Sequence, residues 1–453
     1  GYDAADCYVV ETDPAHPRRY RYDGGWREMV TRTVTVPVKG GPAVTRTFEY
    51  TRHNGVLSPV VARRGTRAWV AASPYMDQAG RFDEQMYRQL RARSVDELLE
   101  ANRMLQMWPT NLVAADARGN TLYLRAGRIP IRPPGHDWTA PVDGGTPATA
   151  WRGVYPLEAL VQLRNPASGY MQNDNVSPDV MFEGSPLTAD RYPADVFADR
   201  LGNQNFRGRR TVDVLSRTFR ATRDDLFALL FDEKWEGAEL WTEALRRALN
   251  ASPALVAARP AEYRTLADRI ARFDGFAHRE SVAALSYLYW RRALSENPAA
   301  NREMVAATFR DSVPPARFDS LMRAAVERAG VLLRQDFHST DRAFGDVFRV
   351  GRGGVSLPLG GFVGTMRAMQ YSPPDSAGLQ WVYSGQRQPL VVIFSDPIQS
   401  WSSLNFGESG RPSSPHYADQ SRLMSEKRLK PTYFYEADLL PHVEWRRTLT
   451  VHR

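Results

Sequence analysis

Two strand-rich ends enclose a helical block, and this order constrains the fold more than any other feature of the sequence. Residues 31–38 and 45–51 alternate polar and apolar side chains with a period of two, which predicts two strands. Residues 39–42, Lys-Gly-Gly-Pro, separate them and are typical of a turn, so we predict a β-hairpin. Further strands are expected in the first part of the chain at 7–12, 69–71, 111–115 and 121–125.

The middle of the chain has helical periodicity. Residues 82–105 are predicted to be helical, with Ser94 as an N-cap. Thr222 and Asp225 form a predicted capping box that opens another helix. The helical spacing returns near 282–289 and 318–326. The last hundred residues again have the pattern of strands. We expect these strands at 347–350, 379–383, 390–394 and 447–451.

Neither set of strands looks complete without the other. We therefore expect one interlocked α+β domain over residues 1–453, whose sheets take strands from both ends of the chain. Its parts would be a strand-rich segment at 1–209, a helical excursion at 210–335 and closing strands at 336–453. A chain of 453 residues is long enough to bury a large core.

Charge, cysteine content and hydropathy exclude several classes of protein. The net charge of +8 is dispersed and accompanies no recognised nucleic-acid module, so we expect a solvated basic surface and no nucleic-acid partner. Cys7 is the only cysteine, which excludes an internal disulfide and zinc sites built on two or more cysteines. No apolar stretch approaches the roughly 18 residues of a membrane span.

Three segments have compositions that suit a functional site. Residues 165–178 are crowded with amide side chains, which either satisfy loop backbone or direct an amide N–H at a developing oxyanion. Asp3, Asp6 and Asp195 lie beside small residues in oxygen-rich loops that suit calcium, although solvated surface aspartates are commoner. Residues 407–420 form a long, polar turn.

In order and spacing, these segments resemble the β-subunit of the penicillin acylase family over nearly the whole chain. The most specific matches are residues 165–178 and 409–420. Their amino-acid sequences resemble those of acyl-homoserine-lactone and lipopeptide acylases most closely. The resemblance implies the αββα sandwich of N-terminal-nucleophile hydrolases, incomplete here and with a helical insertion. It also implies an amidohydrolase whose N-terminal serine attacks the amide and whose α-amino group acts as the base.

The resemblance assigns roles to particular residues. Asn175 takes the place of the asparagine that donates to the oxyanion, and Arg210, placed just before a helix beginning near Thr211, falls near the active site. Met86 and Thr110 lie near positions that line the acyl pocket.

A structural calcium ion is also implied by the resemblance. Its ligands would be the carboxylates of Asp3, Asp6 and Asp195 and the backbone carbonyls of Ala5 and Trp138. One further ligand of the family comes from the α-subunit.

The chain begins with Gly1 and not with serine. We therefore expect the nucleophile, its strand and the α-subunit to be missing partners, and this chain alone to be inactive. The expected substrate is a small acylated amide of penicillin, acyl-homoserine lactone or lipopeptide type, and the expected location is periplasmic or secreted. A truncated or non-catalytic homologue acting as an interaction module is the first alternative, and a basic anion-binding protein is the second.

Overall fold

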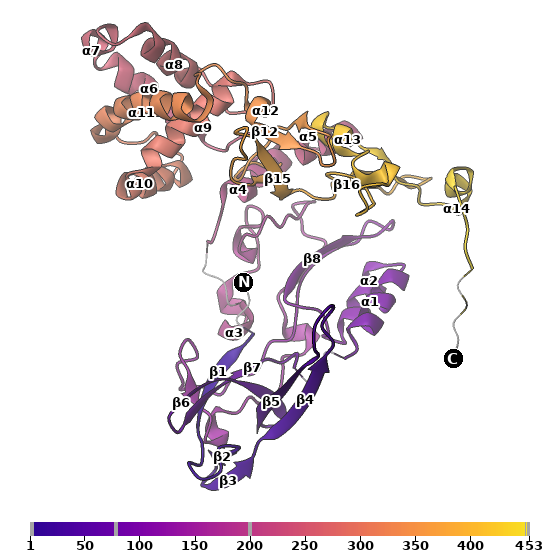
Figure 1. Cartoon of the computed structure of the whole chain (residues 1–453). Coiled ribbons are helices and arrows are strands. Elements are labelled where there is room, and N and C mark those ends of the chain that lie inside the picture. Colours follow the sequence, from indigo (N-terminus) through magenta and orange to yellow (C-terminus); the bar gives the residue numbers. More distant parts are fainter. Residues whose placement is uncertain (1–3, 77–79, 198–201, 449, 451–453) are drawn as a thin grey trace. The chain divides into compact units, whose positions relative to one another are not determined.

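The computed structural model describes residues 4–76, 80–197, 202–448 and 450. They form two compact units, Gly1–Gln204 and Asn205–Arg453, which are described separately (Figure 1). Within the described ranges, no helix combines the length and the apolar character needed to cross a membrane.

The first unit is built on a sheet with the strand order β10–β1–β7–β6–β5–β4. Neighbouring strands are antiparallel except for β1 and β10, which run parallel. The predicted hairpin is confirmed, since β4 and β5 pair along their length and threonine hydroxyls bond across them at 2.9 Å. The strands are β1 (Asp6–Glu11), β4 (Val30–Val36), β5 (Val44–His53), β6 (Val56–Arg64), β7 (Arg67–Ala72) and β10 (Val142–Asp143).

The described residues of this unit also form two smaller sheets and three α-helices. The order β11–β9–β8 forms the second sheet, and β2 pairs with β3. The predicted N-cap is confirmed, because the Ser94 hydroxyl accepts the Glu97 backbone N–H at the start of α2. The elements are β2 (Arg19–Tyr22), β3 (Gly25–Glu28), β8 (Thr110–Ala115), β9 (Thr121–Ala126), β11 (Gln162–Arg164), α1 (Phe82–Arg91), α2 (Val95–Asn102) and α3 (Ala194–Phe197).

Helices dominate the first half of the second unit. Their core contains the indoles of Trp241 and Trp290, which meet edge to face with ring centroids 6.4 Å apart. The helices are α4 (Phe206–Arg217), α5 (Arg223–Leu230), α6 (Ala238–Asn250), α7 (Pro253–Ala257), α8 (Ala261–Ala271), α9 (Val282–Ser295), α10 (Pro298–Phe309), α11 (Asp319–Phe337) and α12 (Phe344–Val347).

The rest of the second unit contains two small sheets, with the orders β13–β12–β15–β14 and β16–β17–β18. Single 3₁₀ turns occur in loops of both units, at Pro147–Thr149, Leu157–Ala159, Pro178–Val180, Ala189–Arg191, Ala316–Phe318, Pro415–Tyr417 and Leu440–His442. The remaining elements are β12 (Phe348–Val350), β13 (Leu357–Pro358), β14 (Gln370–Tyr371), β15 (Gln380–Ser384), β16 (Leu390–Ile393), β17 (Gln399–Ser402), β18 (Lys430–Pro431), α13 (Ser421–Ser425) and α14 (Glu436–Leu439).

Three expectations differ from the structure. Each sheet of the described residues takes its strands from one unit and not from both ends of the chain, while the interlocking of 1–453 into one domain stays a prediction. The strand expected at 447–451 is wrong for residues 447, 448 and 450, which pair with no strand of the described chain. Helix α4 begins at Phe206, because Asn205 caps it by accepting the Gly208 N–H, so Arg210 lies inside the helix and not before it.

Candidate functional site

The amide-rich loop at 165–178 exposes Asn175 at the surface of the first unit. Asn175 has a left-handed backbone conformation, with φ of 62°, which asparagine tolerates better than most residues. Its backbone N–H donates to the side-chain oxygen of Asn173 at 3.3 Å. The loop therefore turns sharply at Asn175 and places its amide group outside the core.

Buried neighbours fix the position of this turn. Val176, Ser177 and Pro178 are buried directly after Asn175. The Ser177 N–H donates to the Asn203 carbonyl at 2.9 Å, and the Pro178 carbonyl accepts the Ser185 hydroxyl at 2.7 Å. A rigid support of this kind is what a side chain needs if it is to hold a defined hydrogen bond to a ligand.

A buried ion pair lies at the start of β1. Both oxygens of the Asp6 carboxylate accept hydrogen bonds from Arg132, at 2.9–3.1 Å, and the indole N–H of Trp151 donates to one of them at 2.6 Å. Arg132 also contacts the Asp195 carboxylate at 3.4 Å. The guanidinium thus links two acidic residues that are 189 positions apart in the sequence.

Several of the residues expected to hold calcium lie close to this arginine. The Arg132 guanidinium lies 5.8 Å from the ring centroid of Trp138, and Ala5 directly precedes Asp6. Asp3 lies outside the described residues. Among those that the structure describes, no three acidic, histidine or cysteine side chains form a metal-binding group. Asp6 and Asp195 are therefore brought together as expected, but around a guanidinium that offsets part of their negative charge.

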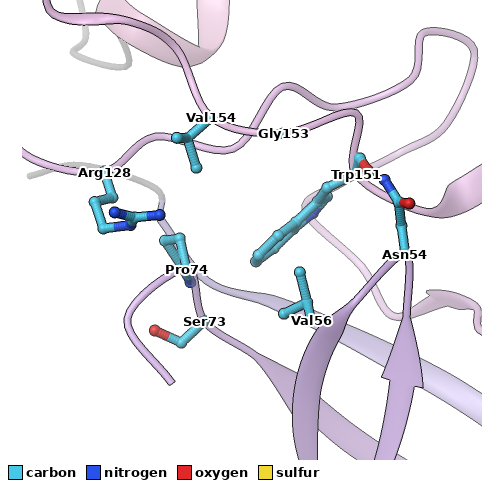
Figure 2. Close-up of a pocket in the computed structure, with 8 residues that line it drawn as sticks. All are labelled: Asn54, Val56, Ser73, Pro74, Arg128, Trp151, Gly153 and Val154. Atoms are coloured by element: carbon cyan, nitrogen blue, oxygen red, sulfur yellow. Dashed lines mark hydrogen bonds between the residues drawn. The ribbon is translucent and has the colours of Figure 1, made fainter. Parts of the chain in front are cut away.

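A cavity of about 170 Å³ is lined by Trp151, the residue that also donates to Asp6 (Figure 2). The buried indole of Trp151 and the Arg128 side chain face the cavity from opposite sides. The side-chain amide of Asn54 donates a hydrogen bond to the Trp151 carbonyl at 2.6 Å. Burial lowers the pKa of Arg128. The cavity is smaller than the roughly 300–1,000 Å³ of most small-molecule sites, so we do not assign the acylated substrate to it.

The two residues expected at the acyl pocket lie on different elements. Met86 is half-buried on α1, and Thr110 is half-buried at the first position of β8. Met86 shares a face of α1 with the exposed Leu90, since the two are four positions apart.

Arg210 belongs to the second unit, where it is held by two carboxylates. Its guanidinium donates to Asp232 at 2.8 and 3.1 Å and to Asp213 at 3.1 Å. Burial alone would lower the pKa of Arg210, but the hydrogen bond that it donates to Asp232 and the charges of the nearby carboxylates together outweigh burial and raise the pKa. The side chain therefore stays charged and fixed against the turn after α5.

Sequence reasoning missed Arg132 and Trp151. The available signal was a single arginine within the apolar, proline-rich run at 129–134, where an unpaired charge would be costly to bury. That signal indicates that a carboxylate partner exists, but it does not say which one. The two partners lie 126 positions before and 63 positions after Arg132.

A family model described as penicillin amidase matches residues 1–440 of the chain. The chain belongs to the penicillin amidase family. An acyl-homoserine lactone acylase of Pseudomonas putida is 26% identical over 98% of this chain, and an aculeacin-A acylase of Actinoplanes utahensis is 28% identical over 94%. The chain spans 60% and 58% of the length of these two relatives, respectively.

The fold is shared with a solved member of the family. A thermostable penicillin G acylase from Alcaligenes faecalis superposes with a TM-score of 0.64 at 16% identity, covering 100% of this chain and 87% of that structure's chain. The predicted fold class, the α+β fold of N-terminal-nucleophile hydrolases, is confirmed by this structural match together with the family model.

Proposed function

We propose that the complete protein hydrolyses the linear amide bond of a small acylated substrate, of penicillin, acyl-homoserine lactone or lipopeptide type. The family match over residues 1–440 and the relatives named as acylases support this proposal. The attacking group would be an N-terminal serine outside residues 1–453, with its α-amino group as the base. The biological outcome would be the breakdown of an antibiotic or of a quorum signal.

The conformation of Asn175 is the observation on which the mechanism rests. When the serine attacks, the carbonyl oxygen of the amide becomes an oxyanion, and a fixed N–H donor lowers the energy of that state more than it lowers the energy of the substrate. Asn175 suits this role because its left-handed backbone turns the side chain outward while Val176, Ser177 and Pro178 anchor the loop.

Replacing Asn175 with alanine in the complete, processed enzyme tests this assignment. We expect kcat to fall by about 10²–10³-fold while KM changes little, because the lost hydrogen bond is strongest in the transition state. Steady-state hydrolysis of an acyl-homoserine lactone and of penicillin G would be measured. Asn301→Ala, on α10 of the other unit, is the matched control and should keep the wild-type kcat.

Near-normal kcat in the folded Asn175→Ala variant would show that Asn175 is only a loop residue. The same measurement on Asn173→Ala would then decide whether the neighbouring asparagine is the donor. If no acylated amide is turned over by the complete wild-type protein, the proposed activity itself is wrong, and the non-catalytic alternative stands.

The acyl group would lie against α1. Met86 and Leu90 form an apolar stripe on this helix, and Leu90 is exposed. Thr110 would border the same pocket, and Arg210 would lie near the active site, as the resemblance implies. The α-subunit and the first part of the β-subunit would be the partners that complete the enzyme, in a periplasmic or secreted location.

Calcium is proposed as a structural ion next to Arg132. The side chains of Asp3, Asp6 and Asp195 carry three negative charges, and Arg132 supplies one positive charge. A divalent cation would supply the other two, and the oxygen atoms of carboxylates and of the Ala5 and Trp138 carbonyls are the ligands that calcium prefers. The ion's contribution would be to stability and not to the chemical step.

A further inference from the structure

A fully buried carboxylate in the second unit has two cationic partners and a histidine. Glu233 accepts hydrogen bonds from Arg367 on one oxygen and from Lys427 on the other, both at 2.6 Å. The Nδ1 of His278 lies 2.6 Å from the oxygen that Lys427 contacts. The cluster joins four segments that are distant in the sequence, and it lies outside the residues assigned to amide hydrolysis.

Backbone hydrogen bonds and a glycine position the Glu233 carboxylate. The Ala277 N–H donates to the Glu233 carbonyl, and the Arg367 N–H donates to the Asp232 carbonyl, both at 2.9 Å. A Cβ at Gly360 would lie 2.3 Å from the Glu233 carboxylate, so only glycine fits there. Lys427 has a φ of 56°, at a position after α13 that glycine usually occupies.

The cluster carries more positive charge than its carboxylate needs. Arg367 is fully buried, and it neutralises Glu233 without help. Lys427 then adds an uncompensated charge, and its side chain is 33% exposed. Asp232 is also close, but it is already paired with Arg210. The excess charge therefore faces solvent through Lys427 and His278.

His278 adds a second polar group on the same side. A separation of 2.6 Å from Glu233 requires that Nδ1 carry a proton and donate it, which leaves Nε2 at the far side of the ring. The ring is 43% exposed and stacks on Phe276, with centroids 5.1 Å apart.

Apolar walls surround this charge. A hollow of about 420 Å³ is lined by the polar side chains of Asp232, Glu233, His278 and Lys427 and by the rings of Phe227, Phe231 and Phe276. This volume lies within the range of about 300–1,000 Å³ found for small-molecule sites, which combine apolar walls with a few polar groups.

We propose that this hollow binds a small organic carboxylate. The Lys427 ammonium contacts the Nδ1 of His278 at 3.3 Å, so the anionic head lies against the solvent-facing side of this pair. The apolar body lies against the three phenylalanines. The excess positive charge selects an anion, and the aromatic walls select an organic anion over an inorganic one. The site does not depend on the proposed amide hydrolysis.

Calorimetric titration of the full chain with benzoate and with benzamide, its neutral analogue, tests the site. We expect benzoate to bind at least tenfold more tightly than benzamide or inorganic phosphate. Lys427→Met should reduce benzoate affinity to that of benzamide, whereas Lys427→Arg should retain it. Lys39→Met, an exposed lysine in the other unit, is the matched control and should bind benzoate as the wild type does.

Equal binding of benzoate and benzamide, no binding of benzoate, or an unchanged affinity in Lys427→Met would overturn the proposal. If phosphate binds as tightly as benzoate, the phenylalanines do not select an organic anion, and the proposal is wrong in that respect. Circular dichroism shows whether Lys427→Met folds. If it does not, His278→Gln, at the more exposed of the two groups, decides the matter, and an unchanged benzoate affinity there overturns the proposal.

Discussion

The buried imidazole of His53 couples the stability of the first unit to pH. It stacks on Tyr8 with centroids 4.5 Å apart, and its Nε2 donates to the Gly144 carbonyl at 2.9 Å. A Cβ at Gly144 would lie 2.8 Å from the Val10 side chain and 2.9 Å from the Tyr8 Cβ, so this close approach requires glycine. Burial lowers the pKa of His53 from 6.5 to about 4, against the opposing effect of the Gly144 hydrogen bond.

We predict that acid destabilises this unit partly through His53. Between pH 6.5 and about pH 4 the unfolded chain binds a proton that the folded chain does not, so stability is lost as the pH falls through this window. The full effect is roughly 3 kcal/mol, at 1.36 kcal/mol per pKa unit. Urea unfolding at several pH values should show a smaller acid loss in His53→Gln, and the exposed control His136→Gln should match the wild type.

Features set by neighbouring residues in the sequence could be predicted, whereas contacts between residues far apart in the sequence could not. The turn at Asn175 could be anticipated because amide side chains and proline mark such loops in one short stretch of sequence. The role of Arg132 could not, because its partners are fixed only by the folded chain. Met86, Thr110 and Arg210 keep their proposed roles as predictions.

At the scale of elements, the capping box of α5 is a case in which sequence and structure agree. The Thr222 hydroxyl accepts the Asp225 N–H at 3.2 Å, and the Asp225 carboxylate accepts the Thr222 N–H at 2.8 Å. Both bonds satisfy backbone donors that a helix start leaves unpaired. The strands β17 and β18 escaped prediction because they are short and have little apolar alternation.

Removing this cap should weaken the second unit without unfolding it. We expect Thr222→Ala to lower the free energy of unfolding by about 1 kcal/mol, as measured by urea denaturation. Thr448→Ala, in the exposed segment near the end of the chain, should have no measurable effect. A Thr222→Ala variant as stable as the wild type would show that the helix start is supported by tertiary contacts alone.

For the whole molecule, the order of strands, helices and strands was predictable, but the partners of the strands were not. Alternation shows which residues form a strand, whereas pairing depends on contacts between segments far apart in the sequence. Strand β1 illustrates this, because it pairs with β7 about 60 residues later and with β10 more than 130 residues later.

The proposed calcium ion would affect the stability of the whole molecule, because it would join the start of β1 to the short helix α3, which contains Asp195. Chelation of divalent ions should lower the Tm of the complete enzyme, and added calcium should restore it. Asp195→Asn should lose this response, while Asp83→Asn, on the exposed face of α1, should keep it. An unchanged Tm after chelation, together with no calcium in metal analysis, would show that Arg132 alone offsets these carboxylates.

The β4–β5 hairpin offers a place to attach a reporter. Every residue of β4 is exposed, so this part of the hairpin is held by its own pairing. Its tip contains Gly40 in a left-handed conformation, and the Gly41 N–H closes the turn to Val38. Loop tips of this kind accept insertions with little loss of stability. A short epitope or fluorophore-binding peptide inserted between Gly40 and Gly41 would therefore label the protein while leaving Asn175, Arg132 and the Lys427 hollow intact.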